Sequence, residues 1–319
     1  MKFSVLITSF FLISCSQLSL RVERNLASDH SKSCFSLAQE LISYTFPAQR
    51  TRLRNLHNHS FTIHSAFKEN QIASLEGFSE LDQTLTKLNV QEMEGVNRGD
   101  GVPYATHPIK LSTLAREILG TDSDEAKRTF HYTMVHDILE EGRGVNHEGI
   151  SFLEKKLKDH KHISDAAYIL VEPDLSSLPL PTEVKESMIE VVGYYRQITF
   201  FAHQRKDRAL LNASIVDKLF NLFDRYDAVQ SGKVVEEEFI LRMKWRLAKQ
   251  GYLLSKMEEF AHPDLTRYAR SFHDNLTREI GSTSEEIQEL IVEFDRLDQL
   301  YGEEIQQIIL RNSEDFSML

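Results

Sequence analysis

Apolar residues recur every three or four positions along almost the whole of this sequence, a spacing typical of amphipathic helices that pack against one another. The clearest stripe consists of Leu211, Ile215, Leu219 and Leu222. We find no run in which apolar and polar residues alternate, as they do in a half-buried strand. Only 13 glycines and 7 prolines interrupt the 319 residues. The sequence therefore predicts an all-α fold, whose helical patterns begin near Phe35.

Charge and cysteine content exclude two classes of protein. The formal charge of −11 argues against a polynucleotide-binding protein, because such proteins present a basic surface to the phosphates. A small phosphorylated molecule can still bind where a metal ion and a few Arg or Lys residues converge. Cys15 and Cys34 are the only cysteines, so the sequence holds no zinc knuckle.

The first residues have the pattern of an export signal. Met1-Lys2 precedes an apolar run, Phe3 to Leu12, that is too short to span a membrane. The tetrad Leu12-Ile13-Ser14-Cys15 resembles a bacterial lipobox. This implies a signal peptide over residues 1–14, a lipidated Cys15, and a protein anchored in the cell envelope, on the periplasmic side of the outer membrane if Ser16 acts as sorting residue. An ordinary signal peptide and an uncleaved anchor are the alternatives. We expect residues 15–34 to form a linker.

The run from Arg128 to Arg143 contains His136-Asp137 followed by Glu140-Glu141, within apolar residues at helical spacing. On one continuous helix, His136 lies beside Glu140 and Asp137 beside Glu141, because residues four apart share a face. An imidazole beside a carboxylate suits a divalent metal ion, and the two glutamates one turn further on could handle a metal-bound water.

Further candidate ligands lie in two other segments. The glycine-containing loop at 97–104 leads to His107-Pro108, where we expect Thr106 or His107 to cap a helix that begins there. In the helix predicted over 210–226, Asp217 lies beside the apolar stripe, four residues before Asn221. A buried carboxylate in the middle of a helix needs a metal ion or a cation as its partner.

Taken in order, these segments resemble the HD-domain phosphohydrolases, and more narrowly the alarmone hydrolases of the RelA/SpoT type and their small stand-alone relatives. The likeness runs from Arg98 to about Asp224. Its strongest parts are the segments 101–108, 135–141 and 216–222. It implies an HD-type helical bundle over residues 35–232, with a C-terminal helical extension over 233–319 that packs on it.

By matching position, the resemblance also implies residue roles. A divalent metal ion, typically manganese (Mn²⁺), is held by His107, His136, Asp137 and Asp217. The acidic pair that handles the attacking water corresponds to Glu140 and Glu141. The substrate pocket includes Arg98, Tyr104 and Asn221. The implied reaction is hydrolysis of a nucleotide phosphate or pyrophosphate ester, in its narrowest form that of a guanosine 3',5'-bis(diphosphate) 3'-pyrophosphohydrolase. Two imidazoles and two carboxylates independently suit a manganese-type or iron-type ion.

The sequence departs from that family at several positions. Glu141 stands where these hydrolases commonly have Asp, Gly99 replaces a basic residue, and Ser214 replaces a Lys. The metal ligands are complete, but the residues that recognise phosphate and base are fewer. An export signal is also unexpected, since guanosine alarmones are cytosolic. Two other functions stay open: a catalytically inactive metal-binding lipoprotein that senses a ligand, and an envelope scaffold in which His-Asp is a coincidence.

Overall fold

Side-chain caps fix the start of several helices in the computed structural model of the chain. Ser79 and Asp82 form a reciprocal capping box at α4 (Glu80–Glu92). Ser123 accepts a hydrogen bond from the backbone of Ala126 at the start of α6 (Asp124–Val135). Asp207 does the same for Ala209 at the start of α11 (Arg208–Gln230). Polar residues in the short segments between the apolar stripes thus determine where these helices begin.

The structure describes residues 44–69, 77–98, 101–142, 149–181, 184–233 and 238–315. Within these ranges the chain is all-α, as predicted, with a single isolated β-bridge between Asn97 and Pro103. The remaining helices are α3 (Phe46–Lys68), α5 (Thr106–Leu119), α7 (Ile138–Glu141), α8 (Ile150–Lys156), α9 (Lys161–Ile169), α10 (Glu186–Arg205), α12 (Phe239–Met257), α13 (Pro263–Glu279) and α14 (Ser284–Asp315). The chain divides into two units, Met1–Gln49 and Arg50–Leu319, and the candidate site lies within the second.

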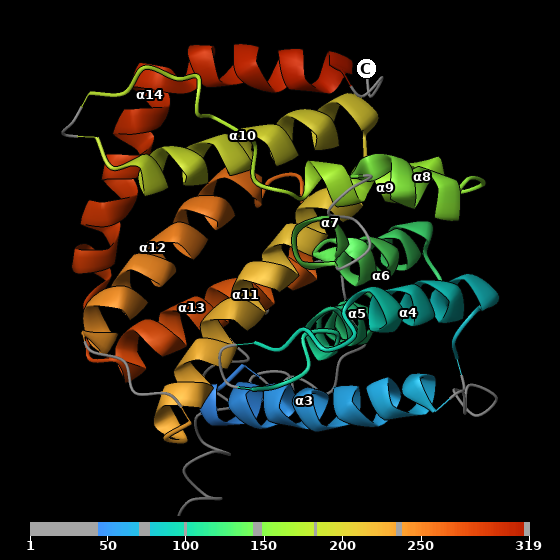
Figure 1. Ribbon diagram of the computed structural model, residues 1–319. Helices are drawn as coiled ribbons and strands as arrows, with labels where there is room; N and C mark the ends of the chain where they lie inside the picture. Colours follow the sequence, from blue (N-terminus) through green and yellow to red (C-terminus); the bar gives the residue numbers. More distant parts are fainter. Residues whose placement is uncertain are drawn as a thin grey trace, which may run out of the picture. The chain divides into compact units, whose positions relative to one another are not determined.

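Helix α11 is the centre of this second unit. It packs against α5 and α6 on one side and against α10, α12 and α13 on the other (Figure 1). Its predicted stripe is buried throughout, with Leu211, Ile215 and Leu219 fully inaccessible and Leu222 2% exposed. Polar residues on α11 beside this stripe are therefore also held inside the protein, next to α5 and α6.

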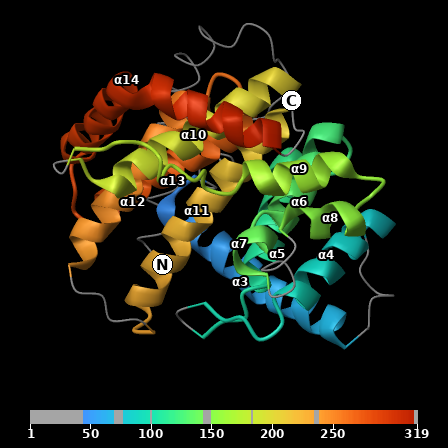
Figure 2. The same ribbon diagram turned by 45° about the horizontal axis from the view of Figure 1, so that its top comes forward.

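The C-terminal helices pack on the same core. Helix α14 changes direction along its length and contacts both α12 and α10 (Figures 1 and 2). Its apolar stripe is largely buried, as at Ile287, Phe294 and Ile305. The domain boundary predicted at residues 232 and 233 stays a prediction. None of the described helices has the length and hydropathy needed to cross a membrane.

Three local predictions were wrong. The single helix expected from Arg128 to Arg143 is interrupted: α6 ends at Val135, residues 136 and 137 form a turn, and α7 follows. The helix after the 97–104 loop is capped by Ala105, without a side-chain bond, so Thr106 and His107 are already helical. The apolar spacing from Leu75 to Leu88 predicts a further helix, but that helix begins only at Glu80, because Ser79 caps it there.

Candidate metal centre

His107 lies in the first turn of α5 and points inward, with 1% of its area exposed. Its Nε2 atom is 3.2 Å from Oδ1 of Asp217 on α11 and 3.9 Å from Oδ2 of Asp137. Its Nδ1 atom faces the carboxylate of Asp224, at 3.6 Å from Oδ2. The start of α5 thus places one imidazole nitrogen among two carboxylates and the other nitrogen next to a third.

His136 and Asp137 occupy the turn between α6 and α7. His136 Nδ1 lies 2.9 Å from the backbone carbonyl of Thr133, so this nitrogen carries a proton and donates it. In an unbroken helix the same carbonyl would accept from the backbone N–H of Asp137. The side chain therefore competes with the helical hydrogen-bond pattern at the point where α6 ends. It also leaves Nε2 as the nitrogen that faces the carboxylates, 3.0 Å from Asp137 Oδ1 and 3.6 Å from Asp217 Oδ1.

Asp217 is buried on α11, and both of its oxygens have partners. Oδ1 accepts a hydrogen bond from Asn221 Nδ2 at 2.7 Å, and Oδ2 pairs with Lys218 Nζ at 2.9 Å. Burial by itself would raise the pKa of Asp217, but Lys218 and the imidazoles of His107 and His136 hold it well below its ordinary value. A carboxylate buried in the middle of a helix was expected to pair with a cation or a metal ion, and Lys218 is such a cation.

His107, His136 and Asp137 form a group that could hold a metal ion, because one ligand atom from each lies within 4.8 Å of the others. Asp217 adjoins this group through the distances given above. Three buried atoms in it lack a hydrogen-bond partner: His107 Nδ1, His136 Nε2 and Asp137 Oδ2. Unsatisfied buried polar atoms are rare in proteins and point to a missing ligand or proton. The donor set of imidazole and carboxylate fits a divalent ion. Asp224 faces Nδ1 of His107, the nitrogen that points away from the cluster, and so is placed to orient the ring.

The electrostatics of the cluster favour an added positive charge. Burial alone would lower the pKa of His136, yet Asp137 and Asp217 outweigh it and raise that pKa well above its ordinary value. Burial would likewise raise the pKa of Asp137, but His136 and His107 lower it. An unprotonated Nε2 lone pair facing carboxylate oxygens at 3.0–3.6 Å is repulsive, so the site requires a proton or a metal ion between them.

Glu140 and Glu141 lie on α7, at the exposed rim beside this cluster. One carboxylate oxygen of Glu140 accepts a hydrogen bond from the backbone N–H of Glu172 at 3.4 Å. Although the Glu140 side chain is exposed at the rim, the protein around it partly desolvates the carboxylate and, together with the charge of Asp137, raises its pKa to about 7. Its carboxylate can therefore accept and release a proton near neutral pH.

The three predicted substrate residues lie together on one side of the cluster. Arg98 donates from Nη2 to Oδ1 of Asn221 at 3.1 Å, and its Nη1 lies 3.4 Å from Asp224 Oδ2. The Arg98 guanidinium also lies over the ring of Tyr104, 5.6 Å from the centroid. Tyr104 in turn meets the ring of His107 edge-on, at 6.2 Å. Arg98, Tyr104 and Asn221 thus form a connected wall next to the candidate ligands.

Sequence reasoning missed three charged residues around the site. Asp224 contacts His107 and accepts a hydrogen bond from the fully buried Lys110 Nζ at 2.6 Å. Burial would raise the pKa of Asp224, but Lys110, His107 and Arg98 lower it strongly. Lys218 lies over the ring of Tyr194, 4.4 Å from the centroid, while it pairs with Asp217. Helical spacing was an available signal, since Lys110 follows His107 by three positions and Asp224 follows Asn221 by three.

Several predicted features lie outside the described residues: the signal peptide with Cys15, the linker over residues 15–34, the helical pattern that begins near Phe35, and Gly99. Comparison with known proteins adds no family assignment, because no protein-family model, curated protein or solved structure matches the chain. The roles of the site residues therefore depend on the geometry above and on the resemblance of the motifs.

Proposed function

We propose that this protein is a metal-dependent phosphohydrolase of the HD type. The observation that carries the proposal is the convergence of four side chains from three separate segments, His107, His136, Asp137 and Asp217, in one buried cluster. The hydrogen bond from His136 to Thr133 supports it, because it leaves Nε2 directed at the cluster as a ligand. The wall of Arg98, Tyr104 and Asn221 beside the cluster supports a substrate with a phosphate group.

The side chains would divide the work as follows. His107, His136, Asp137 and Asp217 would hold a divalent ion, which we propose to be Mn²⁺, and that ion would supply Lewis acidity at the phosphoryl group. Glu140 would accept a proton from the attacking water and return one to the leaving group, with Glu141 beside it at the rim. Arg98, whose guanidinium lies beside Asp224 and Asn221, would bind a phosphate oxygen of the substrate.

We propose a phosphorylated nucleotide as the substrate class, with guanosine 3',5'-bis(diphosphate) as the specific candidate that the motif resemblance suggests. Lys218 could replace the Lys that the family has at the position of Ser214. Ser214 is buried and bonds to the hydroxyl of Tyr194, while Lys218, one helical turn later, contacts the same ring and Asp217. A cation therefore stands near the position where the family has its Lys, which supports phosphate binding despite the substitution.

We also propose that the protein is a lipoprotein of the cell envelope, anchored through Cys15. This proposal depends on the lipobox-like tetrad alone. It would place the substrate on the outer side of the inner membrane, where the protein would meet phosphorylated compounds released from the cytosol.

A metal analysis and a phosphate-release screen test the enzyme proposal. The chain lacking residues 1–14 is purified, analysed for bound divalent metal, and assayed with Mn²⁺ against a panel of nucleotides. Bound metal with turnover supports the hydrolase. Metal without turnover on any nucleotide supports the ligand-sensing lipoprotein, and a protein without metal supports the scaffold.

A pair of variants checks the assigned roles. We expect Asp217→Ala to lose both metal and activity, because it removes a ligand, and Glu140→Gln to keep the metal and lose rate, because it removes a proton acceptor. Equal loss of metal in both variants would contradict this division of roles.

A further inference from the structure

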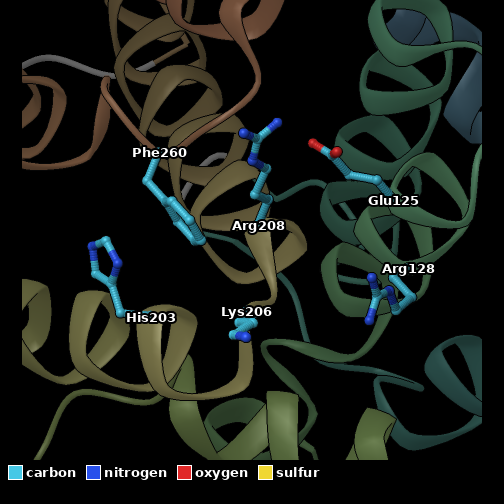
Figure 3. Close-up of a pocket in the computed structure, with 6 residues that line it drawn as sticks. All are labelled: Glu125, Arg128, His203, Lys206, Arg208 and Phe260. Atoms are coloured by element: carbon cyan, nitrogen blue, oxygen red, sulfur yellow. The ribbon is translucent and has the colours of Figure 1, made fainter.

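A cavity away from the metal centre opens where the turn between α10 and α11 meets α6. Its volume is about 470 Å³. Figure 3 shows six side chains arranged around it, contributed by α6, the end of α10, the start of α11 and the turn after α12: Glu125, Arg128, His203, Lys206, Arg208 and Phe260. Along α6, Arg128 lies about 12 Å from the His136 turn, at 1.5 Å per helical residue. The cavity is therefore separate from the candidate metal ligands.

Positive charge is concentrated on its walls. Within the described part of the chain, no carboxylate pairs with Lys206 or Arg208. Arg128 approaches Asp207 at 3.5 Å from Nη1 to Oδ2, and its Nε atom is buried without a hydrogen-bond partner. The carboxylate of Glu125 on the opposite wall already accepts a hydrogen bond from Asn212 at 2.9 Å. The chain as a whole has a formal charge of −11, so this local group of cations differs from the rest of the protein and is suited to bind an anion.

The backbone at Lys206 gives an independent sign of function. Lys206 ends α10 in the left-handed conformation, with φ 52° and ψ 40°, a position that glycine fills at least strain. It is one of the two non-glycine residues with positive φ in the described chain. A side chain kept at such a position despite strain is a candidate for a functional role.

An aromatic surface adjoins the cations. The rings of His203 and Phe260 lie 4.4 Å apart at an angle of 31°, and the Arg208 guanidinium lies 5.6 Å from the Phe260 centroid. This pair offers a flat apolar contact directly beside Lys206 and Arg208. The combination of cations with flat rings beside them is that of a site for a phosphate attached to a planar group.

We propose that this cavity binds a phosphate-bearing small molecule of nucleotide size. Its phosphate lies among Arg128, Lys206 and Arg208, and its planar group contacts His203 and Phe260. Glu125 accepts a hydrogen bond from a donor on that planar group. The site is independent of the proposed hydrolase activity, because none of its residues belongs to the metal centre.

Calorimetric titration of the full chain with inorganic pyrophosphate tests the phosphate part. EDTA is present throughout, so that no divalent ion at the metal centre contributes. The decisive variant is Lys206→Gly, which removes the cation while giving the left-handed backbone its preferred residue, so the fold is retained. Lys127→Ala is the matched control, since it removes an exposed cation from α6 next to Arg128, outside the cavity.

We expect wild type and Lys127→Ala to bind pyrophosphate equally and Lys206→Gly to bind at least about tenfold more weakly, the loss expected for one charge-assisted hydrogen bond. Unchanged affinity in Lys206→Gly, or an equal loss in Lys127→Ala, overturns the site. The planar part is tested with guanosine monophosphate: Phe260→Leu should weaken its binding and leave that of pyrophosphate unchanged. Equal binding of the monophosphate by wild type and Phe260→Leu refutes the aromatic contact. None of these results depends on turnover, so they stand apart from the test of the hydrolase.

Discussion

Removal of one candidate ligand should remove most of the stabilisation that a bound metal ion gives to the folded chain. A ligand that binds only the native state adds about 2.7 kcal/mol at one hundred times its dissociation constant. For a domain of this size, 1 kcal/mol corresponds to a shift of about 2–4 °C in Tm. We therefore expect Mn²⁺ at that excess to raise the Tm of the wild-type protein by roughly 5–10 °C above its value in EDTA.

Asp217→Ala is the perturbation. It removes the oxygen that lies 3.2 Å and 3.6 Å from the two imidazole nitrogens and leaves the group of His107, His136 and Asp137. A loss of affinity of about 100-fold, the upper end of what even supporting residues contribute, would reduce the gain to about 0.4 kcal/mol and the shift to about 1 °C.

Differential scanning calorimetry, with and without Mn²⁺, measures both shifts. Asp227→Ala is the control, because Asp227 is a carboxylate on the same helix that pairs with Arg50 and Arg54 outside the cluster. It should lower the Tm slightly and keep the full metal-dependent shift. A wild-type protein whose Tm does not respond to Mn²⁺, or an Asp217→Ala variant that responds as strongly as wild type, would refute the reasoning.

Three further predictions concern other residues. Glu140→Gln should reduce the rate of phosphate release by about 10²–10⁴-fold with unchanged metal content, since it removes a proton acceptor and no ligand; an undiminished rate would contradict its role. Burial raises the pKa of Asp82, but its bonds to His131 and Ser79 and the charge of Arg116 lower it overall, so its stabilising effect is present above about pH 4 and is lost as the pH falls. The unfolding free energy of wild type should therefore fall on acidification more steeply than that of Asp82→Asn, by up to about 1.4 kcal/mol per pH unit, and parallel curves in urea titrations would disprove this. Cys15→Ala should abolish labelling by a radioactive fatty acid and release the protein from membranes, whereas unchanged fractionation would remove the lipoprotein proposal.

The fold class follows from the sequence because burial of apolar stripes is a local, periodic property. Leu211, Ile215 and Leu219 are placed on one face of α11 by helical geometry alone, and the structure buries all three. The apolar pattern does not predict where a side chain competes with a backbone N–H for a carbonyl and so ends a helix. The turn at His136 lies within an unbroken helical spacing of apolar residues. The hydrogen bond from its side chain to the carbonyl of Thr133 interrupts the helix, and apolar periodicity does not predict such a bond.

The candidate site was predictable in its members but not in its surroundings. Helical spacing and motif order together selected His107 and Asp217, which are 110 positions apart and whose Nε2 and Oδ1 atoms lie 3.2 Å from each other. Helical spacing placed Lys110 and Asp224 on the same faces as His107 and Asn221, but their burial as an ion pair was missed, because a Lys in an apolar helix is normally expected to reach solvent. Its burial depends on where α5 and α11 meet, which is a tertiary property.

Anomalous X-ray diffraction from crystals grown with Mn²⁺ tests the central claim most directly. Our account predicts one strong anomalous peak at coordinating distance from Nε2 of both His107 and His136 and from the carboxylates of Asp137 and Asp217. A map without a peak at this cluster, or with manganese bound only elsewhere on the protein, would contradict it.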